Sequence, residues 1–471
     1  MGLIRSASGV TTLKIFKALI GFLGVLFLTR ITSQTTLGQY FLYAAVVTLA
    51  SVLASAGVNG ATEKRISEGQ PAGEVYTGSI GIKGVAVLVT VLGLLLFRSH
   101  INSYMGFDGV ALVAFGILAR ESSMLVRRVL RGENRVLLAV GLGTLQLMTF
   151  YVVGTTALLL DIGVIGLIYG FITSHVLVTG LAVWFQQTRP GDLTVERCRS
   201  IIDYAKSNII TSVGGIIYKK LDIVLLGVFV APSAIAAYEV AWRLSSVGVI
   251  FAQSISITLF PKISAWYSDE QIEKIREAVN SALVPSLGFV IPIWIGGTLL
   301  NADLLTVLYG EAYAVASLSL SIILFERILR AGNKTISRCL SAVDRPDLAA
   351  TATVISIITN VVLNLLLIPQ FGIAGAAIGT SVSFGLKLVI EGVYLQRIVA
   401  IKYPIREIVW MFTAACIMGL VVEFAKQYII PRQMLGLFML IALGGASYLG
   451  VLAISKDIRQ FGRVLFGEII S

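Results

Sequence analysis

Apolar residues run through this chain in blocks of about the length that crosses a membrane, separated by short charged segments. A helix needs roughly 20 apolar residues, at about 1.5 Å each, to span a hydrocarbon core of about 30 Å. The uncharged windows at residues 136–160 and 278–302 each fit one crossing. Residues 348–386 form an uncharged run of nearly twice that length, which Pro369 and Gly372 interrupt. We therefore interpret this run as two crossings joined by a turn.

The hydropathy pattern of the whole chain predicts fourteen membrane-spanning helices. Their expected positions are residues 10–30, 37–59, 76–97, 108–130, 136–160, 163–186, 203–230, 234–260, 278–300, 313–338, 348–368, 373–396, 407–428 and 433–455. Lysines and arginines are retained on the cytoplasmic side of short loops. With the N-terminus in the cytoplasm, the segments on that side hold 23 of these residues and the outer segments hold 4. Both termini are therefore expected in the cytoplasm.

Composition agrees with an all-α polytopic protein of the cell membrane. Hydrophobic residues make up 56% of the chain and charged residues 13%, whereas a soluble domain has about 25% charged residues. The net charge of +11 is explained by basic loops that face an anionic inner leaflet, so no nucleic-acid partner is predicted. The sequence has no phosphate-loop motif, and its histidines and cysteines lack metal-ligand spacing. We expect a transporter without metal, cofactor or catalytic residues, rather than an enzyme.

An internal repeat divides the expected helices into two groups. Residues 158–174 match residues 367–383 at an offset of 209. The matched pairs are Gly166 with Gly375, Gly170 with Gly379, and Ser174 with Ser383. A weaker match, at an offset of 198, pairs residues 27–43 with residues 225–241. Repeats of this kind are typical of transporters.

The repeat predicts two six-helix lobes in parallel orientation, followed by two C-terminal helices. The expected organisation is a first lobe at residues 1–186, a cytoplasmic linker at 187–202, a second lobe at 203–400, and two additional helices with a cytoplasmic tail at 401–471.

Two stretches resemble a known family. Residues 360–380, NVVLNLLLIPQFGIAGAAIGT, resemble the C-terminal signature of polysaccharide export flippases. These are O-antigen-type translocases of the multidrug/oligosaccharidyl-lipid/polysaccharide exporter superfamily. Residues 28–47, LTRITSQTTLGQYFLYAAVV, are similar to the family's N-terminal stretch.

The resemblance implies a flippase that moves a polyprenyl-(di)phosphate-linked oligosaccharide from the cytoplasmic to the outer leaflet. Transport would proceed by alternating access through a cationic cavity, for surface polysaccharide or protein glycosylation. The expected partners are the lipid-linked oligosaccharide and the bilayer, with glycan-assembly enzymes as further candidates. We expect the protein to be a monomer.

The signature residues themselves fit turn formation and helix packing. Pro369 and Gly372 form the turn, Gly375 and Gly379 give one helix a small-residue face, and Asn360 and Asn364 share a face four residues apart. We interpret all six as structural rather than as substrate contacts.

Charged residues inside the expected spans are the better candidates for substrate contact, because each is costly against lipid. The spans hold ten basic and six acidic residues, a balance that suits an anionic substrate. The candidate contacts are Lys17, Arg30, Arg120, Lys219, Lys220, Glu239, Arg243 and Arg327. Lys219 and Lys220 lie mid-helix, where a lysine cannot easily reach the headgroups. The resemblance also implies that helices 1, 2, 7 and 8 line the cavity, which favours six of the eight, namely Lys17, Arg30, Lys219, Lys220, Glu239 and Arg243.

Mutual neutralisation is the alternative reading for Glu239 and Arg243, which are four residues apart. At the level of function, a lipid II-type flippase is the nearest alternative. A multidrug or cation antiporter of the same superfamily would need a carboxylate, and the spans of the first lobe offer only Glu121. A membrane-embedded glycan polymerase or ligase would need a long outer loop, whereas the outer loops here are short.

Overall fold

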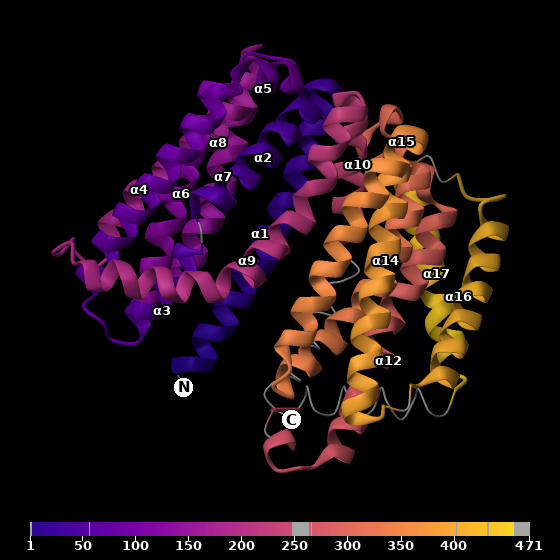
Figure 1. The fold of residues 1–471 in the computed structure, drawn as a ribbon. Coiled ribbons are helices and arrows are strands. Elements are labelled where there is room, and N and C mark those ends of the chain that lie inside the picture. Colours follow the sequence, from indigo (N-terminus) through magenta and orange to yellow (C-terminus); the bar gives the residue numbers. More distant parts are fainter. Residues whose placement is uncertain are drawn as a thin grey trace. The chain divides into compact units, whose positions relative to one another are not determined.

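The computed structural model describes residues 2–55, 57–246, 263–264, 266–401, 403–430 and 433–455, with side chains for all of these except 2–8, 207–219 and 280–281. Every regular element in these ranges is a helix (Figure 1). The chain divides into two compact units, Met1–Ala236 and Ala237–Ser471.

The first unit is a bundle of long helices with two short ones. Its elements are α1 (Gly2–Ile31), α2 (Gln34–Ser55), α3 (Val58–Ser67), α4 (Ala72–Leu96), α5 (Arg98–Met105), α6 (Val110–Gly132), α7 (Val136–Leu159), α8 (Val164–Phe185), α9 (Val195–Phe229) and the start of α10 (Pro232–Ser245). Helix α7 packs against α1 and α8, and α6 packs against α2, α3 and α8. Helix α9 packs against α2, α3 and α4, where Val58, Leu125 and Ile201 contribute to one apolar core.

The second unit is built around α14 and α15. Its further elements are α12 (Ile272–Leu299), α13 (Asn301–Tyr309), the 3-10 helix η2 (Glu311–Ala316), α14 (Ser317–Ala342), α15 (Pro346–Val399), α16 (Ile405–Ala425) and α17 (Met434–Leu452). Helix α14 packs against α12 and α15, while α16 packs against α12 and α17. Val290, Met418 and Leu440 lie in the core that α12 shares with the two C-terminal helices.

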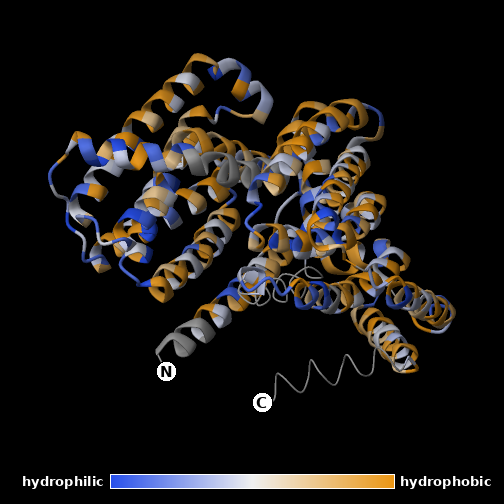
Figure 2. Ribbon diagram, turned by 60° about the horizontal axis from the view of Figure 1, so that its bottom comes forward, coloured by the Kyte–Doolittle hydropathy of each residue, from blue (hydrophilic) through white to orange (hydrophobic). Residues whose placement is uncertain are grey.

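The described helices have the length and apolar surface of membrane spans. Among the described residues, ten helices meet these criteria, or eleven if α5 and α6, bent by 91°, form one span. Figure 2 shows apolar residues along most of the length of the helices. Large apolar side chains such as Leu96, Trp184 and Leu420 are exposed, as lipid-facing residues would be. The predicted count of fourteen spans stays a prediction.

Several helix boundaries differ from the sequence prediction. Helix α9 begins at Val195, inside the segment predicted as a linker, because Thr194 caps it by accepting a hydrogen bond from the Arg197 N–H. The predicted span at residues 37–59 ends at Ser55, and α3 follows after Gly57, whose φ of 81° lies in the left-handed region. The predicted span at 234–260 is α10 as far as Ser245, and residues 247–260 lie outside the described residues.

The turn between α7 and α8 recurs inside α15. Gly163 has φ 65° and ψ −144°, and Gly372, 209 residues later, has φ 54° and ψ −131°. These angles are nearly exclusive to glycine. The long helix α15 is therefore two helices joined at Gly372. The two hairpins share their turn geometry, whereas the predicted lobe boundaries stay a prediction.

The turn that precedes each hairpin also recurs. Asn134 and Asp344, 210 residues apart, have φ values of 61° and 56°. Each is followed by an arginine, Arg135 or Arg345, at the N-cap of the next helix. Asn and Asp tolerate the left-handed conformation better than other side chains, which explains their presence here.

Candidate functional site

The cationic residues predicted on α1 and α9 differ in exposure. Lys17 is half-buried on α1, and Arg30 is exposed at the end of the same helix. Lys220 is half-buried on α9. The side chain of Lys219 lies outside the described residues.

Lys17 belongs to a group of cations on α1 and α6, which we call the cation cluster and define as Lys17, Arg127 and Arg131. Lys17 Nζ and Arg127 NH1 lie 3.4 Å and 3.0 Å from the point where a Cβ on Gly143 of α7 would sit. The missing side chain at Gly143 thus leaves room for both cationic groups. Arg127 and Arg131 are one turn apart on α6, so they share a face of that helix.

The cation cluster lacks counter-charges within ion-pair distance in the part of the chain that the structure describes. Arg127 Nε donates a hydrogen bond to the Ser123 carbonyl at 3.2 Å, which leaves its positive charge uncompensated. Arg131 Nε is buried without a hydrogen-bond partner among the described residues. Cations gathered without carboxylates repel one another, and an anion would relieve this repulsion.

A buried, neutral histidine lies next to the cation cluster, so it adds no charge to the cluster. His175 on α8 contacts Ser123 Oγ through Nδ1 at 2.6 Å and Gln146 Nε2 through Nε2 at 2.9 Å. Because the Gln146 amide donates, Nε2 is an acceptor, so the proton of the ring is on Nδ1 and the imidazole is neutral. The ring also contacts Phe171 in a tilted arrangement, with 4.6 Å between centroids and 58° between the ring planes.

Arg120, a predicted substrate contact, lies in a network of two cations around one carboxylate. Arg120 NH1 pairs with Glu121 Oε1 at 2.9 Å, and Lys83 Nζ from α4 pairs with Glu121 Oε2 at 2.8 Å. Lys83 also donates to Asn59 Oδ1 and to the Glu121 carbonyl, each at 2.9 Å. Lys83 and Glu121 are almost fully buried, so this network is a closed structural group.

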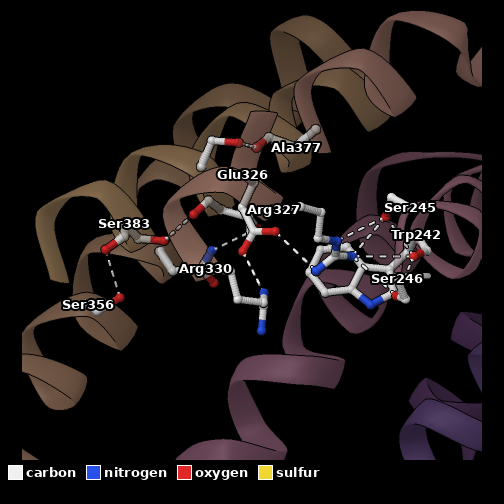
Figure 3. Close-up of polar contacts among 12 residues, drawn as sticks. Trp242, Ser245, Ser246, Glu326, Arg327, Arg330, Ser356, Ala377 and Ser383 are labelled. Carbon is white, nitrogen blue, oxygen red and sulfur yellow. Dashed lines mark hydrogen bonds and ion pairs between the residues drawn. The ribbon is translucent and has the colours of Figure 1, made fainter. Parts of the chain in front are cut away.

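In the second unit, Arg327 is buried in a network of aromatic and hydroxyl groups (Figure 3). Its guanidinium donates to Ser245 Oγ through Nε at 3.1 Å and through NH2 at 2.9 Å. It pairs with Glu326 Oε2 at 3.1 Å and lies over the Trp242 ring at 4.1 Å. Sequence analysis selected Arg327 but gave no indication of the tryptophan from α10.

Arg330 shares the same carboxylate. Its NH2 group lies 2.7 Å from Glu326 Oε1, and the guanidinium lies 4.0 Å from the centroid of Phe384. Figure 3 shows Arg327 and Arg330 on either side of the Glu326 carboxylate. Two guanidinium groups thus share one carboxylate that is fully buried.

Glu239 and Arg243 form the ion pair that their spacing indicated. Arg243 NH2 lies 3.1 Å from Glu239 Oε1, with the carboxylate buried and the guanidinium half-exposed. The alternative reading, mutual neutralisation, fits this geometry, and contact with substrate stays a prediction.

The six signature residues lie at the hairpin within α15. Asn364 Nδ2 donates to Asn360 Oδ1 and Asn360 Nδ2 donates to Thr380 Oγ1, each at 3.2 Å. A Cβ on Gly375 would lie 2.3 Å from the Leu367 carbonyl oxygen, so only glycine permits this approach of the two halves. A Cβ on Gly379 would similarly lie 2.8 Å from Asn364 Oδ1, and Pro369 lies three residues before the turn at Gly372. This geometry agrees with a packing role.

Sequence reasoning counted Arg127 and Arg131 only as cytoplasmic charges. Their spacing was the available signal, because Ser123, Arg127 and Arg131 recur every four residues and must share a face of one helix. Among the described residues, no group of His, Cys, Asp and Glu has the geometry of a metal site.

Comparison with known proteins places these observations in context. The family model described as "Polysaccharide biosynthesis protein" matches residues 27–318, and the one described as "Lipid II flippase MurJ" matches residues 195–444. A "Probable low-salt glycan biosynthesis flippase" of Haloferax volcanii is 32% identical over 98% of each chain. A "Probable flippase" of the same organism is 28% identical over 95% of each chain.

Solved structures show where the fold recurs. The chain is similar to an inward closed conformation of a lipid II flippase with a TM-score of 0.81 and 16% identity, covering 98% of this chain and 99% of the other. An inward-facing multidrug resistance transporter matches with a TM-score of 0.65 and 16% identity, covering 82% of this chain and 94% of the other.

Proposed function

This chain belongs to the polysaccharide and oligosaccharide-lipid flippase family, and from that membership we propose that it translocates a polyprenyl-(di)phosphate-linked oligosaccharide across the membrane. Transport runs from the cytoplasmic to the outer leaflet by alternating access through a cationic cavity. The product serves surface polysaccharide or protein glycosylation. The protein acts in the cell membrane as a monomer with both termini in the cytoplasm.

The observation that supports this proposal is the cation cluster. Three basic side chains on α1 and α6 lack carboxylates within ion-pair distance among the described residues. A phosphate or diphosphate supplies the missing negative charge and accepts charge-assisted hydrogen bonds from Lys17 and Arg127. The polyprenyl tail stays in lipid during the passage, and the protein makes no covalent bond to the substrate.

Replacing Lys17 or Arg127 with Gln tests the proposal in a strain whose glycan export depends on this flippase. A hydrogen bond to a charged group contributes about 1.5–3 kcal/mol, so each variant should lose roughly 10- to 100-fold in export rate. Lys17→Arg should retain most of the export because it keeps the charge.

Lys14→Gln is the matched control, because Lys14 is exposed on the same helix one turn away. Protein levels are followed by immunoblotting. Unchanged export in Lys17→Gln and Arg127→Gln at normal protein levels would show that the cation cluster does not bind substrate.

A lipid II-type flippase is the second candidate, because the corresponding family model matches residues 195–444. Purified protein in lipid vesicles distinguishes the two substrates. The assay compares a fluorescent polyprenyl-diphosphoryl hexosamine probe with the same probe bearing a pentapeptide. Faster transport of the probe without peptide supports the proposed function, and the opposite preference supports the second candidate.

The cation antiporter is disfavoured by the state of Glu121. Both oxygens of this buried carboxylate are already paired, with Arg120 at 2.9 Å and Lys83 at 2.8 Å. A cation would have to displace two positive charges to bind there.

A further inference from the structure

Helix α1 packs against α7 through a series of contacts about one turn apart. In each of five contacts, a glycine on one helix faces a larger side chain on the other. The pairs are Gly9 with Leu137, Leu13 with Gly141, Lys17 with Gly143, Gly21 with Leu147, and Gly24 with Tyr151. We call this series the α1–α7 zipper. Residue numbers rise together along both helices, so α1 and α7 run parallel in a defined register.

The alternation of glycines between the two helices selects this register. Small residues let two helices approach closely in a membrane. If α1 slid by one turn in one direction, Leu13 would face Leu137. In the other direction, Lys17 would face Leu147. Either slide sets one large side chain against another, so the observed register packs best.

Tyr151 holds the register at the C-terminal end of the zipper. Its ring fills the space that a Cβ on Gly24 would occupy. Its hydroxyl donates a hydrogen bond to the Gly21 carbonyl at 3.0 Å. The preceding residue of α7, Phe150, stacks on Tyr40 of α2 with 5.2 Å between centroids. A side chain of α7 is thus bonded to the backbone of α1 one turn from Lys17.

Lys17 is the charged member of the zipper, and its position depends on the register. Its Nζ shares the space over Gly143 with Arg127 NH1. Two like charges repel, and the stem of a lysine is flexible. The ammonium would therefore move away from Arg127 if α1 were free to slide or turn on α7.

We propose that Tyr151 is a positioning residue, which locks α1 on α7 and thereby holds Lys17 in the cation cluster. Tyr151 acts through Lys17 and makes no contact with the substrate. This inference rests on the proposed function, in which the cluster binds phosphate, whereas the register can be measured without transport. Loss of the Tyr151 hydroxyl weakens substrate binding more than it slows translocation.

Cysteine cross-linking in lipid vesicles tests the register. In a full-length chain without its three native cysteines, Leu13→Cys with Gly141→Cys should form a disulfide under mild oxidation. Leu13→Cys with Leu137→Cys, one turn out of register, should form several-fold less. Adding Tyr151→Phe should lower the first yield and raise the second. Equal yields for the two pairs, or yields that Tyr151→Phe leaves unchanged, would overturn the lock.

Transport of the fluorescent polyprenyl-diphosphoryl hexosamine probe tests the positioning role. Tyr151→Phe keeps the ring on Gly24 and removes only the hydroxyl, so it should raise the apparent KM about 2- to 10-fold, with a smaller change in the maximal rate. Tyr169→Phe, which removes an exposed hydroxyl on α8, is the matched control.

A double-mutant cycle shows whether Tyr151 acts through Lys17. In a Lys17→Gln background, Tyr151→Phe should raise the apparent KM no further, because the two residues act as one unit. A full additional rise in that background would contradict the proposal. So would an unchanged KM in Tyr151→Phe alone, or a lower maximal rate without a rise in KM.

An exchange of partners tests the zipper itself. Gly21→Leu places two leucines at one contact, so it should raise the apparent KM and lower the in-register cross-link. Adding Leu147→Gly should return both toward the wild-type values. Gly84→Leu on α4 is the control, because a Cβ there would meet no atom within 4 Å. A double variant no better than Gly21→Leu would contradict the zipper. If wild type moves no probe, the proposed function fails, and the cross-links still decide the register.

Discussion

The Glu121 carboxylate holds two cations inside the first unit, Arg120 through Oε1 and Lys83 through Oε2. Glu121→Gln removes the counter-charge of both, whereas Lys83→Met leaves the pair with Arg120 intact. Breaking a buried pair by removing one partner costs about 3–5 kcal/mol. We expect Glu121→Gln to lower the free energy of unfolding by about this amount, and Lys83→Met to lower it by less.

Thermal unfolding of the purified full-length protein measures both variants. Glu423→Gln serves as the control, since it removes an exposed carboxylate from α16 and should leave the unfolding temperature nearly unchanged. Equal losses in Lys83→Met and Glu121→Gln would mean that Arg120 does not stabilise the carboxylate.

Sequence reasoning at this scale succeeded where partners lie on one helix. The pairs Glu239–Arg243 and Asn360–Asn364 are each four residues apart, and the structure shows both contacts. Lys83 is 38 residues from Glu121 and lies on another helix, so periodicity could not pair them. The same limit applies to the Arg327 network, because Trp242 comes from α10.

At the scale of elements, the repeated turn makes a prediction about glycine. Gly163 and Gly372 have positive φ and extended ψ, which a residue with a Cβ adopts at a cost of about 1–3 kcal/mol. Gly163→Ala and Gly372→Ala should each destabilise the protein by this amount. Thermal unfolding again provides the measurement.

Gly180→Ala is the control for this pair, because Gly180 is a helical residue of α8 and an added Cβ would meet no atom within 4 Å. A helical Gly→Ala substitution stabilises by up to about 1 kcal/mol. If Gly163→Ala and Gly372→Ala changed the unfolding temperature no more than Gly180→Ala does, the conformation of the two turns would not require glycine.

Apolar runs predicted helices well where charged residues flank the run on both sides. The prediction of a helix at residues 136–160 corresponds to α7 at Val136–Leu159. The start of α9 was missed because its first turns are polar, with Glu196, Arg197 and Arg199. A cap at Thr194, rather than apolarity, defines that end of the helix.

For the whole molecule, the distribution of charge, rather than packing, predicts which side of the membrane each helix end faces. The 23 basic residues assigned to one side and the 4 assigned to the other predict which helix ends face the cytoplasm. Packing within each unit would be the same in either orientation. The orientation of the two lobes therefore calls for a direct measurement.

Cysteine labelling in cells provides it. In a chain whose Cys198, Cys339 and Cys416 are replaced by Ser, single cysteines are introduced at exposed residues next to the repeated turns. The outer pair is Ile162→Cys and Phe371→Cys, and the inner pair is Leu137→Cys and Asp347→Cys. The members of each pair are 209 or 210 residues apart, so each pair samples the same place in the two lobes.

A parallel repeat requires an even number of spans between the members of each pair. Ile162→Cys and Phe371→Cys should both react with an impermeant maleimide in intact cells. Leu137→Cys and Asp347→Cys should react only after permeabilisation. If the two members of one pair were labelled from opposite sides, an odd number of spans would lie between them. The second lobe would then be inverted in the membrane, and every charge assigned to it would face the other side.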